Sequence, residues 1–204
     1  MASASETIQI VADGLGFHPS TVRSYFREIQ KAGLIGKGGR GRAAEHFSPA
    51  DTARIVIALM GASSLAEAPA MVRLLGSTCC LIPGERGWPD QRYRFDEVLG
   101  ELFRWAASIE HNGTALHHFD LGTLDDTTLV EVRVMSTDLM ADVYVDDELS
   151  MRFRLVHQIP EPPDAMQADI QRYLVSRVDG SRMRTTQSIN EGVIRRIASG
   201  LPQS

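Results

Sequence analysis

Basic side chains are concentrated near the start of the chain. Between residues 16 and 43 the sequence has six of them and a single acid, Glu28. The six are Arg23, Arg27, Lys31, Lys37, Arg40 and Arg42. A guanidinium group presents a planar fork of N–H donors, which fits the paired oxygens of a phosphate or two acceptors on the edge of guanine. Because the whole chain has a net charge of −5, the positive charge is local and indicates contact with a polyanion.

Two short helices are predicted to position the first of these side chains. Residues 6–15 have apolar side chains at helix spacing, and Gly16 ends the pattern. A second helix is predicted from Pro19, a residue type favoured at the first helical position, to a stop at Gly33. Its predicted apolar face consists of Val22, Tyr25, Phe26 and Ile29.

The spacing from Ile8 to Arg27 agrees with a helix-turn-helix. Such a unit needs a small residue where its helices cross, here Ala12, and a glycine in the tight turn, here Gly16. The apolar residues expected to lock the helices together are Val11, Leu15, Phe17, Val22 and Tyr25. This layout resembles the DNA-binding helix-turn-helix of bacterial and phage transcription regulators, and a prophage-type regulator in particular.

A further resemblance is to the winged variant of this unit. The segments "TVRSYF" and "AGLI", followed by a loop rich in glycine and arginine, are similar to those of MerR-type regulators. The resemblance covers about the first 60 residues. The stretch between the two segments is longer than in MerR proteins, and no dimerising coiled coil or metal-sensing cysteine pattern follows. We therefore infer no metal-sensor role.

The resemblance implies that the start of the second helix enters the major groove of DNA. The side chains predicted to face the DNA are His18, Ser20, Thr21, Arg23, Ser24 and Arg27. Arg23 suits a bidentate contact with guanine. Ser20, Thr21 and the amides at the helix start suit phosphate. The alternative is an ordinary helical hairpin with a solvated polar face.

The glycine-rich stretch "GLIGKGGRGRAAEHFSP", residues 33–49, is interpreted as the wing. In a winged helix this segment forms a β-hairpin, here with residues 34–35 and 46–47 as its paired ends. Lys37, Arg40 and Arg42 would then lie near the tip, where two arginines on a flexible backbone suit an A·T-rich minor groove. The alternative is a disordered linker, because glycine density alone predicts mobility.

The remaining elements follow from local signals. Ser48 and Asp51 have capping-box spacing before a very apolar helix, and Ser64 and Glu67 repeat that spacing before a helix closed by Gly76. Prolines and glycines in residues 77–90 predict a linker. A helical stripe follows over residues 95–109. Alternating patterns predict strands at residues 128–136, 141–145, 148–156, 172–178 and 181–186, with a final helix capped from Ser188.

These elements predict an α+β fold. Residues 1–76 are expected to form a winged helix-turn-helix domain, and residues 91–204 an α+β domain with an antiparallel sheet of about five strands flanked by helices. The two cysteines, Cys79 and Cys80, are adjacent and are interpreted as reduced thiols. No targeting or membrane-spanning run is present in the sequence, so a cytoplasmic protein is expected. No metal, cofactor or catalytic residue is predicted.

The predicted function is sequence-specific binding of double-stranded DNA as a transcription regulator. One helix-turn-helix buries little surface, so a homodimer on a palindromic operator is expected. The C-terminal half would serve dimerisation or bind a protein partner. Two alternatives stay open: a phage DNA-packaging or assembly protein, and a metal-dependent DNA-processing enzyme. The enzyme would bind Mg²⁺ through an acidic set consisting of Asp138, Asp142, Asp146, Asp147 and Glu148.

Overall fold

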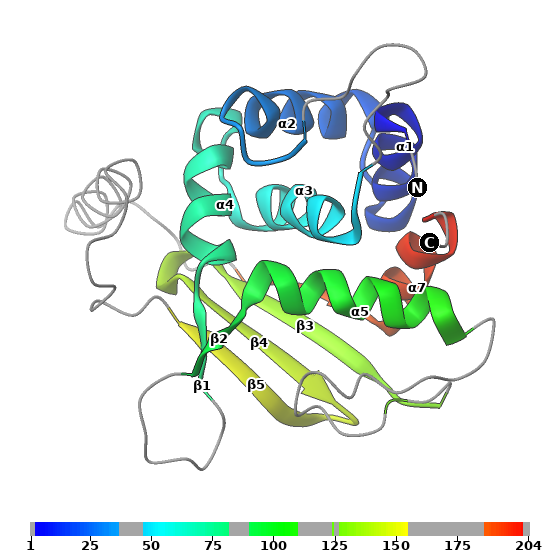
Figure 1. The fold of residues 1–204 in the computed structure, drawn as a ribbon, viewed down its shortest axis with the longest axis vertical. Coiled ribbons are helices and arrows are strands. Elements are labelled where there is room, and N and C mark those ends of the chain that lie inside the picture. Colours follow the sequence, from blue (N-terminus) through cyan, green and yellow to red (C-terminus); the bar gives the residue numbers. More distant parts are fainter. Residues whose placement is uncertain are drawn as a thin grey trace.

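The protein has helices on one side of an antiparallel sheet, and Figure 1 shows these layers from the side. The computed structural model describes residues 3–36, 47–81, 90–109, 124, 127–154 and 186–201. The first four helices are stacked above a long fifth helix, which lies on the sheet (Figure 1). The predicted α+β class is confirmed.

The described residues of the N-terminal half form four α-helices and one short 3₁₀ helix. They are α1 (Ala4–Leu15), α2 (Pro19–Lys31), α3 (Pro49–Gly61), η2 (Leu65–Glu67) and α4 (Ala68–Gly76). Helix α1 begins two residues earlier than predicted because Ser3 and Glu6 form a capping box. The predicted box of Ser48 and Asp51 is confirmed at the start of α3.

Two predicted caps are wrong. Ser64 makes no side-chain cap; its neighbour Ser63 hydrogen-bonds to the Glu67 carboxylate instead, and η2 precedes α4. At the other end of the chain, Ser188 lies in a strand, and the side chain of Asn190 accepts from the Val193 amide at 3.1 Å. In both cases more than one polar residue near the helix start has the spacing expected of a cap. The residue that makes the hydrogen bond is not the predicted one.

The sheet has six described strands in the order β2-β1-β5-β4-β3-β6, all paired antiparallel. They are β1 (Cys79–Leu81), β2 (Asp90–Arg94), β3 (Val130–Met135), β4 (Met140–Val145), β5 (Glu148–Arg154) and β6 (Thr186–Asn190). Three of the predicted strands correspond to β3, β4 and β5. Asp146 and Asp147, both with positive φ, form the turn between β4 and β5 as expected. The predicted strand at residues 172–178 lies outside the described residues, as does the one at 181–186 except for Thr186, the first residue of β6.

Strand β1 lies inside the segment predicted to be a linker, and it pairs with both β2 and β5. The N-terminal helices also pack closely on the second half. Helix α3 packs against α5 (Phe95–Ile109), and α1 packs against α7 (Glu191–Gly200). One buried apolar cluster includes residues from both halves. The division into two domains stays a prediction, whereas the described parts of both halves share a core.

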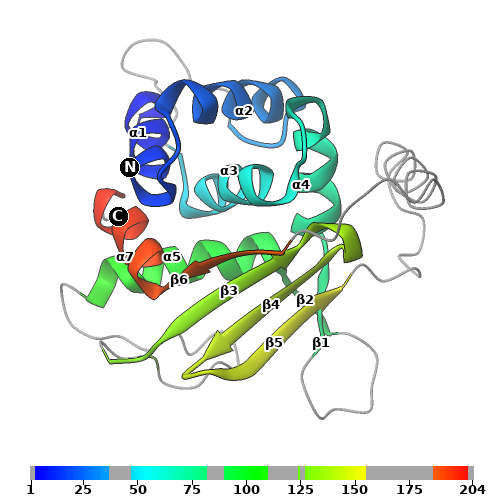
Figure 2. The same ribbon diagram turned by 180° about the vertical axis from the view of Figure 1, so that it is seen from behind.

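Glycine allows the contact between α1 and α7. A Cβ atom at Gly14 would clash with the Ile197 side chain, and one at Gly200 would clash with Ile10. Both helices therefore approach more closely than side-chain-bearing residues would permit. Figure 2 shows α7 directly beneath α1. The last described helix thus supports α1, which in turn packs against α2.

Over the described parts of the chain, no helix combines the length and apolar character needed to cross a bilayer.

Candidate nucleic-acid interface

A tight turn of three residues, Gly16 to His18, joins α1 to α2. Gly16 has φ 72°, a left-handed conformation that suits glycine. The amide of the next residue, Phe17, donates to the carbonyl of Ala12 at 3.0 Å and closes the end of α1. The glycine predicted for the turn is therefore at the position that requires it.

One residue of the predicted apolar lock is placed differently. Phe17 is 38% exposed, whereas Val11 and Val22 are fully buried. Leu15 and Tyr25 are partly buried against the core. The prediction that Phe17 helps to lock the helices is wrong: the residue lies in the turn, where its amide caps α1 and its side chain is exposed rather than part of the core.

The inner face of α2 is held firmly in the core. Val22, Phe26 and Ile29 are buried. The ring of Phe26 contacts Phe47 edge to face, with a centroid separation of 5.1 Å. Because this apolar face is buried, the opposite face of α2 is turned toward solvent.

That opposite face carries polar and basic side chains. Ser20, Arg23, Ser24, Arg27 and Lys31 are exposed. Their spacing of three, one, three and four residues places them in one stripe along the helix. His18 is exposed just before the stripe, and Thr21 is half-buried at its side. The structure thus brings five of the six predicted DNA contacts on α2 to the surface.

The arginines of this stripe are free to bind an external anion. Among the described residues, neither Arg23 nor Arg27 has an ion-pair partner, while Lys31 pairs with Glu28 at 2.7 Å. The first turn of α2 has no acidic residue, unlike the first turns of α1, α3, α5 and α7. Because a helix start is electropositive, α2 leaves that positive potential without a carboxylate to neutralise it.

The start of α2 is capped by an imidazole. His18 Nδ1 accepts from the Ser20 amide at 3.3 Å and lies 2.7 Å from the Ser20 hydroxyl oxygen. The Ser24 hydroxyl donates to the Ser20 carbonyl at 3.0 Å. The amide and the hydroxyl of Ser20 therefore already contact His18 Nδ1. A phosphate that bound these two groups would displace the imidazole.

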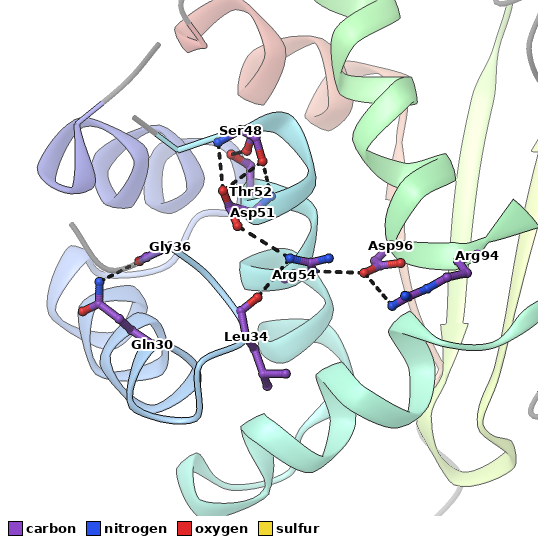
Figure 3. Close-up of polar contacts among 9 residues, drawn as sticks. All are labelled: Gln30, Leu34, Gly36, Ser48, Asp51, Thr52, Arg54, Arg94 and Asp96. Carbon is purple, nitrogen blue, oxygen red and sulfur yellow. Dashed lines mark hydrogen bonds and ion pairs between the residues drawn. The ribbon is translucent and has the colours of Figure 1, made fainter. Parts of the chain in front are cut away.

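A buried ion-pair network fixes the chain that follows α2 (Figure 3). The Arg54 guanidinium donates to the Leu34 carbonyl and to Asp96 Oδ2, each at 3.0 Å. Asp96 is 1% exposed and also accepts from Arg94 at 3.1 Å. Arg54 of α3 thus connects the turn after α2 to α5 and to the edge strand β2.

The two ends of the predicted wing are anchored. Ile35 and Phe47 are buried in the core, and the Gln30 side chain donates to the Gly36 carbonyl at 3.0 Å. Lys37, Arg40 and Arg42 lie outside the described residues, as does His46, so the wing stays a prediction.

The acidic residues proposed for the alternative enzyme are engaged in other ways. Asp142 on β4 is 2% exposed and accepts both ends of the Arg152 fork at 2.7 Å. Asp146 and Asp147 form the hairpin turn. In the described ranges, no three or more side chains of the usual ligand types come together as a metal site.

Arg133 and Glu131 form an ion pair on the face of β3 that is turned away from the buried Val130, Val132 and Val134. Arg133 donates to both oxygens of Glu131 and lies over the Tyr144 ring at 4.2 Å. The hydrogen bonds and charge of Arg133 lower the pKa of Glu131 below its ordinary value. Arg133 and Arg152 on this face of the sheet are thus each held by a carboxylate, whereas Arg154 contacts the sulfur of Met140.

A hollow of about 280 Å³ lies where the sheet meets the start of α7. Glu131, Tyr144 and Asn190 are among its lining residues. Glu131 pairs with Arg133 and Glu191 with Arg195, so two of its carboxylates are already neutralised. The hollow has neither a free cation nor a metal-ligand set in its described lining.

Comparison with known proteins gives no family assignment: no family model, curated protein or solved structure matches the chain. The interface therefore rests on its own geometry. One residue of the exposed stripe and one residue that supports the turn after α2 were not among the predicted residues. Lys31 continues the stripe four residues after Arg27, a spacing visible in the sequence. Arg54 has no local signal because its partner Asp96 is 42 residues away.

Proposed function

We propose that this protein is a sequence-specific DNA-binding transcription regulator that reads the major groove with α2. The observation that carries the proposal is the exposed basic stripe on α2, in which Arg23 and Arg27 have no ion-pair partner in the described chain. The helix follows a tight turn and is fixed by a buried inner face. Those are the features that a recognition helix needs.

The dimensions of α2 fit this role. With 13 residues and a rise of about 1.5 Å per residue, the helix is about 20 Å long. The major groove is about 12 Å wide and admits a helix with its side chains. Arg23, near the start of α2, would donate two hydrogen bonds to guanine, while Arg27 and Lys31 would contact phosphates farther along the helix.

The glycine-rich segment would extend the contact. Because its two ends are anchored beside α2, Lys37, Arg40 and Arg42 would reach the neighbouring backbone or minor groove. The rest of the chain is acidic overall, so it would face away from DNA. It would supply the dimer contact that places two α2 helices on a palindromic site, or a surface for a protein partner.

Binding to a selected DNA site tests this function. A high-affinity duplex is first selected from a random library with the wild-type protein, and every base pair is then varied. Arg23→Ala is expected to weaken binding by about 1–3 kcal/mol and to remove discrimination at one guanine. Arg104→Ala is the matched control, because Arg104 is exposed on α5, away from α2.

Two results would contradict the proposal. One is failure of the wild-type protein to enrich any sequence. The other is equal binding by wild type and Arg23→Ala at every base position. An assembly protein would instead bind without sequence preference and sediment as a larger ring.

A further inference from the structure

Phe17, in the turn between α1 and α2, is an aromatic residue that the fold leaves largely uncovered. Its side chain is 38% exposed, and it belongs neither to the buried cluster nor to the partly buried side chains packed against that cluster. In the described chain, Phe26 contacts Phe47 and Phe95 contacts Phe153, whereas Phe17 has no ring partner. A single exposed apolar residue is common on protein surfaces. What gives Phe17 significance is its position.

Phe17 lies directly before the proposed recognition helix. Its neighbours Gly16 and His18 are exposed, as is Ser20 in the first turn of α2. The backbone of the turn is held in place, because the Phe17 amide donates to the Ala12 carbonyl at 3.0 Å. Exposed residues therefore lead along the chain from the turn into the basic stripe of α2. A duplex that contacts the start of α2 would meet the Phe17 ring as well.

The surface of the major groove limits what an aromatic ring can bind there. Most groups on the base edges are polar donors and acceptors, and the C5 methyl of thymine is the one methyl group among them. A ring placed against a polar group would remove water from it without replacing the hydrogen bond. Phenylalanine wedges that separate base steps act from the minor groove. The chemistry of the ring and the groove together thus favour the thymine methyl.

We propose that Phe17 is a specificity-determining residue that contacts the C5 methyl of a thymine near the guanine bound by Arg23. This contact rests on the proposed function. Arg23 lies five residues after His18, the N-cap of α2, which is about 7.5 Å along the helix. Successive base pairs are about 3.4 Å apart. The thymine is therefore expected within about three base pairs of that guanine.

Deoxyuridine substitution in the selected duplex tests this contact, because deoxyuridine pairs as thymine does and lacks only the C5 methyl. Each thymine is replaced in turn, and affinity is measured at one salt concentration. At one position within about three base pairs of the guanine, wild type is expected to lose about fourfold in affinity, the equivalent of one buried methyl group. Phe17→Ala is expected to bind the thymine and deoxyuridine duplexes equally there, while it keeps the preference for guanine.

Leu129→Ala is the matched control. Leu129 is also an exposed apolar residue, and it directly precedes β3 in the sheet, which α3 and α5 separate from α2 (Figure 1). This variant is expected to show the wild-type loss with deoxyuridine.

Several results would overturn the thymine contact alone. They are a selected site with no thymine in that range, full affinity of wild type for every deoxyuridine duplex, or a loss with deoxyuridine that Phe17→Ala retains. Loss of the guanine preference in Phe17→Ala would also overturn it, because Phe17 would then position α2 rather than contact a base. Failure of wild type to enrich any sequence would instead overturn the proposed function, and the thymine contact with it.

Discussion

Arg23 and Arg27 differ from most arginines of the described helices in the partners available to them. Arg54, Arg104 and Arg195 each have a carboxylate partner within the protein. An arginine already held by a carboxylate must break that contact before it can bind a phosphate. Arg23 and Arg27, which have no ion-pair partner among the described residues, bear no such cost, and this is the physical reason for proposing that they bind DNA.

Arg54 is expected to be important for stability. Arg54→Ala leaves the buried Asp96 with Arg94 as its only described cationic partner and frees the Leu34 carbonyl. The expected loss in unfolding free energy is about 3 kcal/mol, measured by urea denaturation. Arg104→Ala, which breaks an exposed pair, should cost below about 1 kcal/mol. Equal losses for both variants would show that the buried network contributes no more than a surface pair.

The pair of Glu131 and Arg133 predicts a pH dependence. Hydrogen bonds and charge from Arg133 lower the pKa of Glu131 in the folded state, relative to the ordinary value of 4.5. The pair therefore stabilises the fold above that value, and the stabilisation is lost as pH falls through the lowered pKa. Unfolding measured over this acid range should show a steeper loss for wild type than for Arg133→Ala. Parallel curves would contradict the assignment.

At the scale of elements, the close contact of α1 with α7 helps to fix the position of α2, which carries the candidate interface. Helix α1 packs on α2 from one side and on α7 from the other. Any change that separates α1 from α7 therefore acts on the packing of α1 and α2 without touching the exposed basic stripe of α2.

Gly14→Ala tests this contact. The added methyl would collide with Ile197, and overpacking of this kind costs about 1–3 kcal/mol in unfolding free energy. Gly192→Ala is the control, since its Cβ would meet only an atom of Asn190 at 3.4 Å. In an Ile197→Ala background the penalty of Gly14→Ala should shrink. An unchanged loss of unfolding free energy in that background would show that the added methyl does not collide with Ile197.

Elements with strong local signals could be predicted from the sequence. The Ser48 cap, the apolar face of α2 and the alternation in β3 to β5 depend on neighbours a few residues apart. Strands β1 and β6 have no such signal: β1 has three residues and β6 a single buried side chain, so their places are set by pairing with distant strands. The exposure of Phe17 was missed for a related reason, because spacing does not reveal which way a turn residue points.

At the scale of the whole molecule, the net charge is negative, so the proposed binding to DNA would depend on a local positive surface. Repulsion from phosphates would be overcome only where α2 and the glycine-rich segment approach the duplex. Binding should therefore be salt-dependent, with a slope set by the number of phosphate contacts.

The double variant Arg40→Ala/Arg42→Ala is expected to reduce the slope of log K against log salt by about 2. Its affinity should fall to a similar extent for all sequences, because minor-groove and phosphate contacts carry little base information. Titrations at several salt concentrations measure both effects. A loss confined to one base position would instead assign these arginines to direct readout.

The packing of α7 against α1 also has a consequence for synthesis. Helix α1 is translated before its neighbour α7, which follows all six described strands of the sheet. Until then Ile10 and Gly14 lack the surface that covers them. Contacts between such distant segments form late and slow folding. If the protein binds DNA as proposed, a nascent chain would therefore not complete the packing of α1 and α2 before the sheet has been translated, which would limit premature engagement of DNA by unfinished chains.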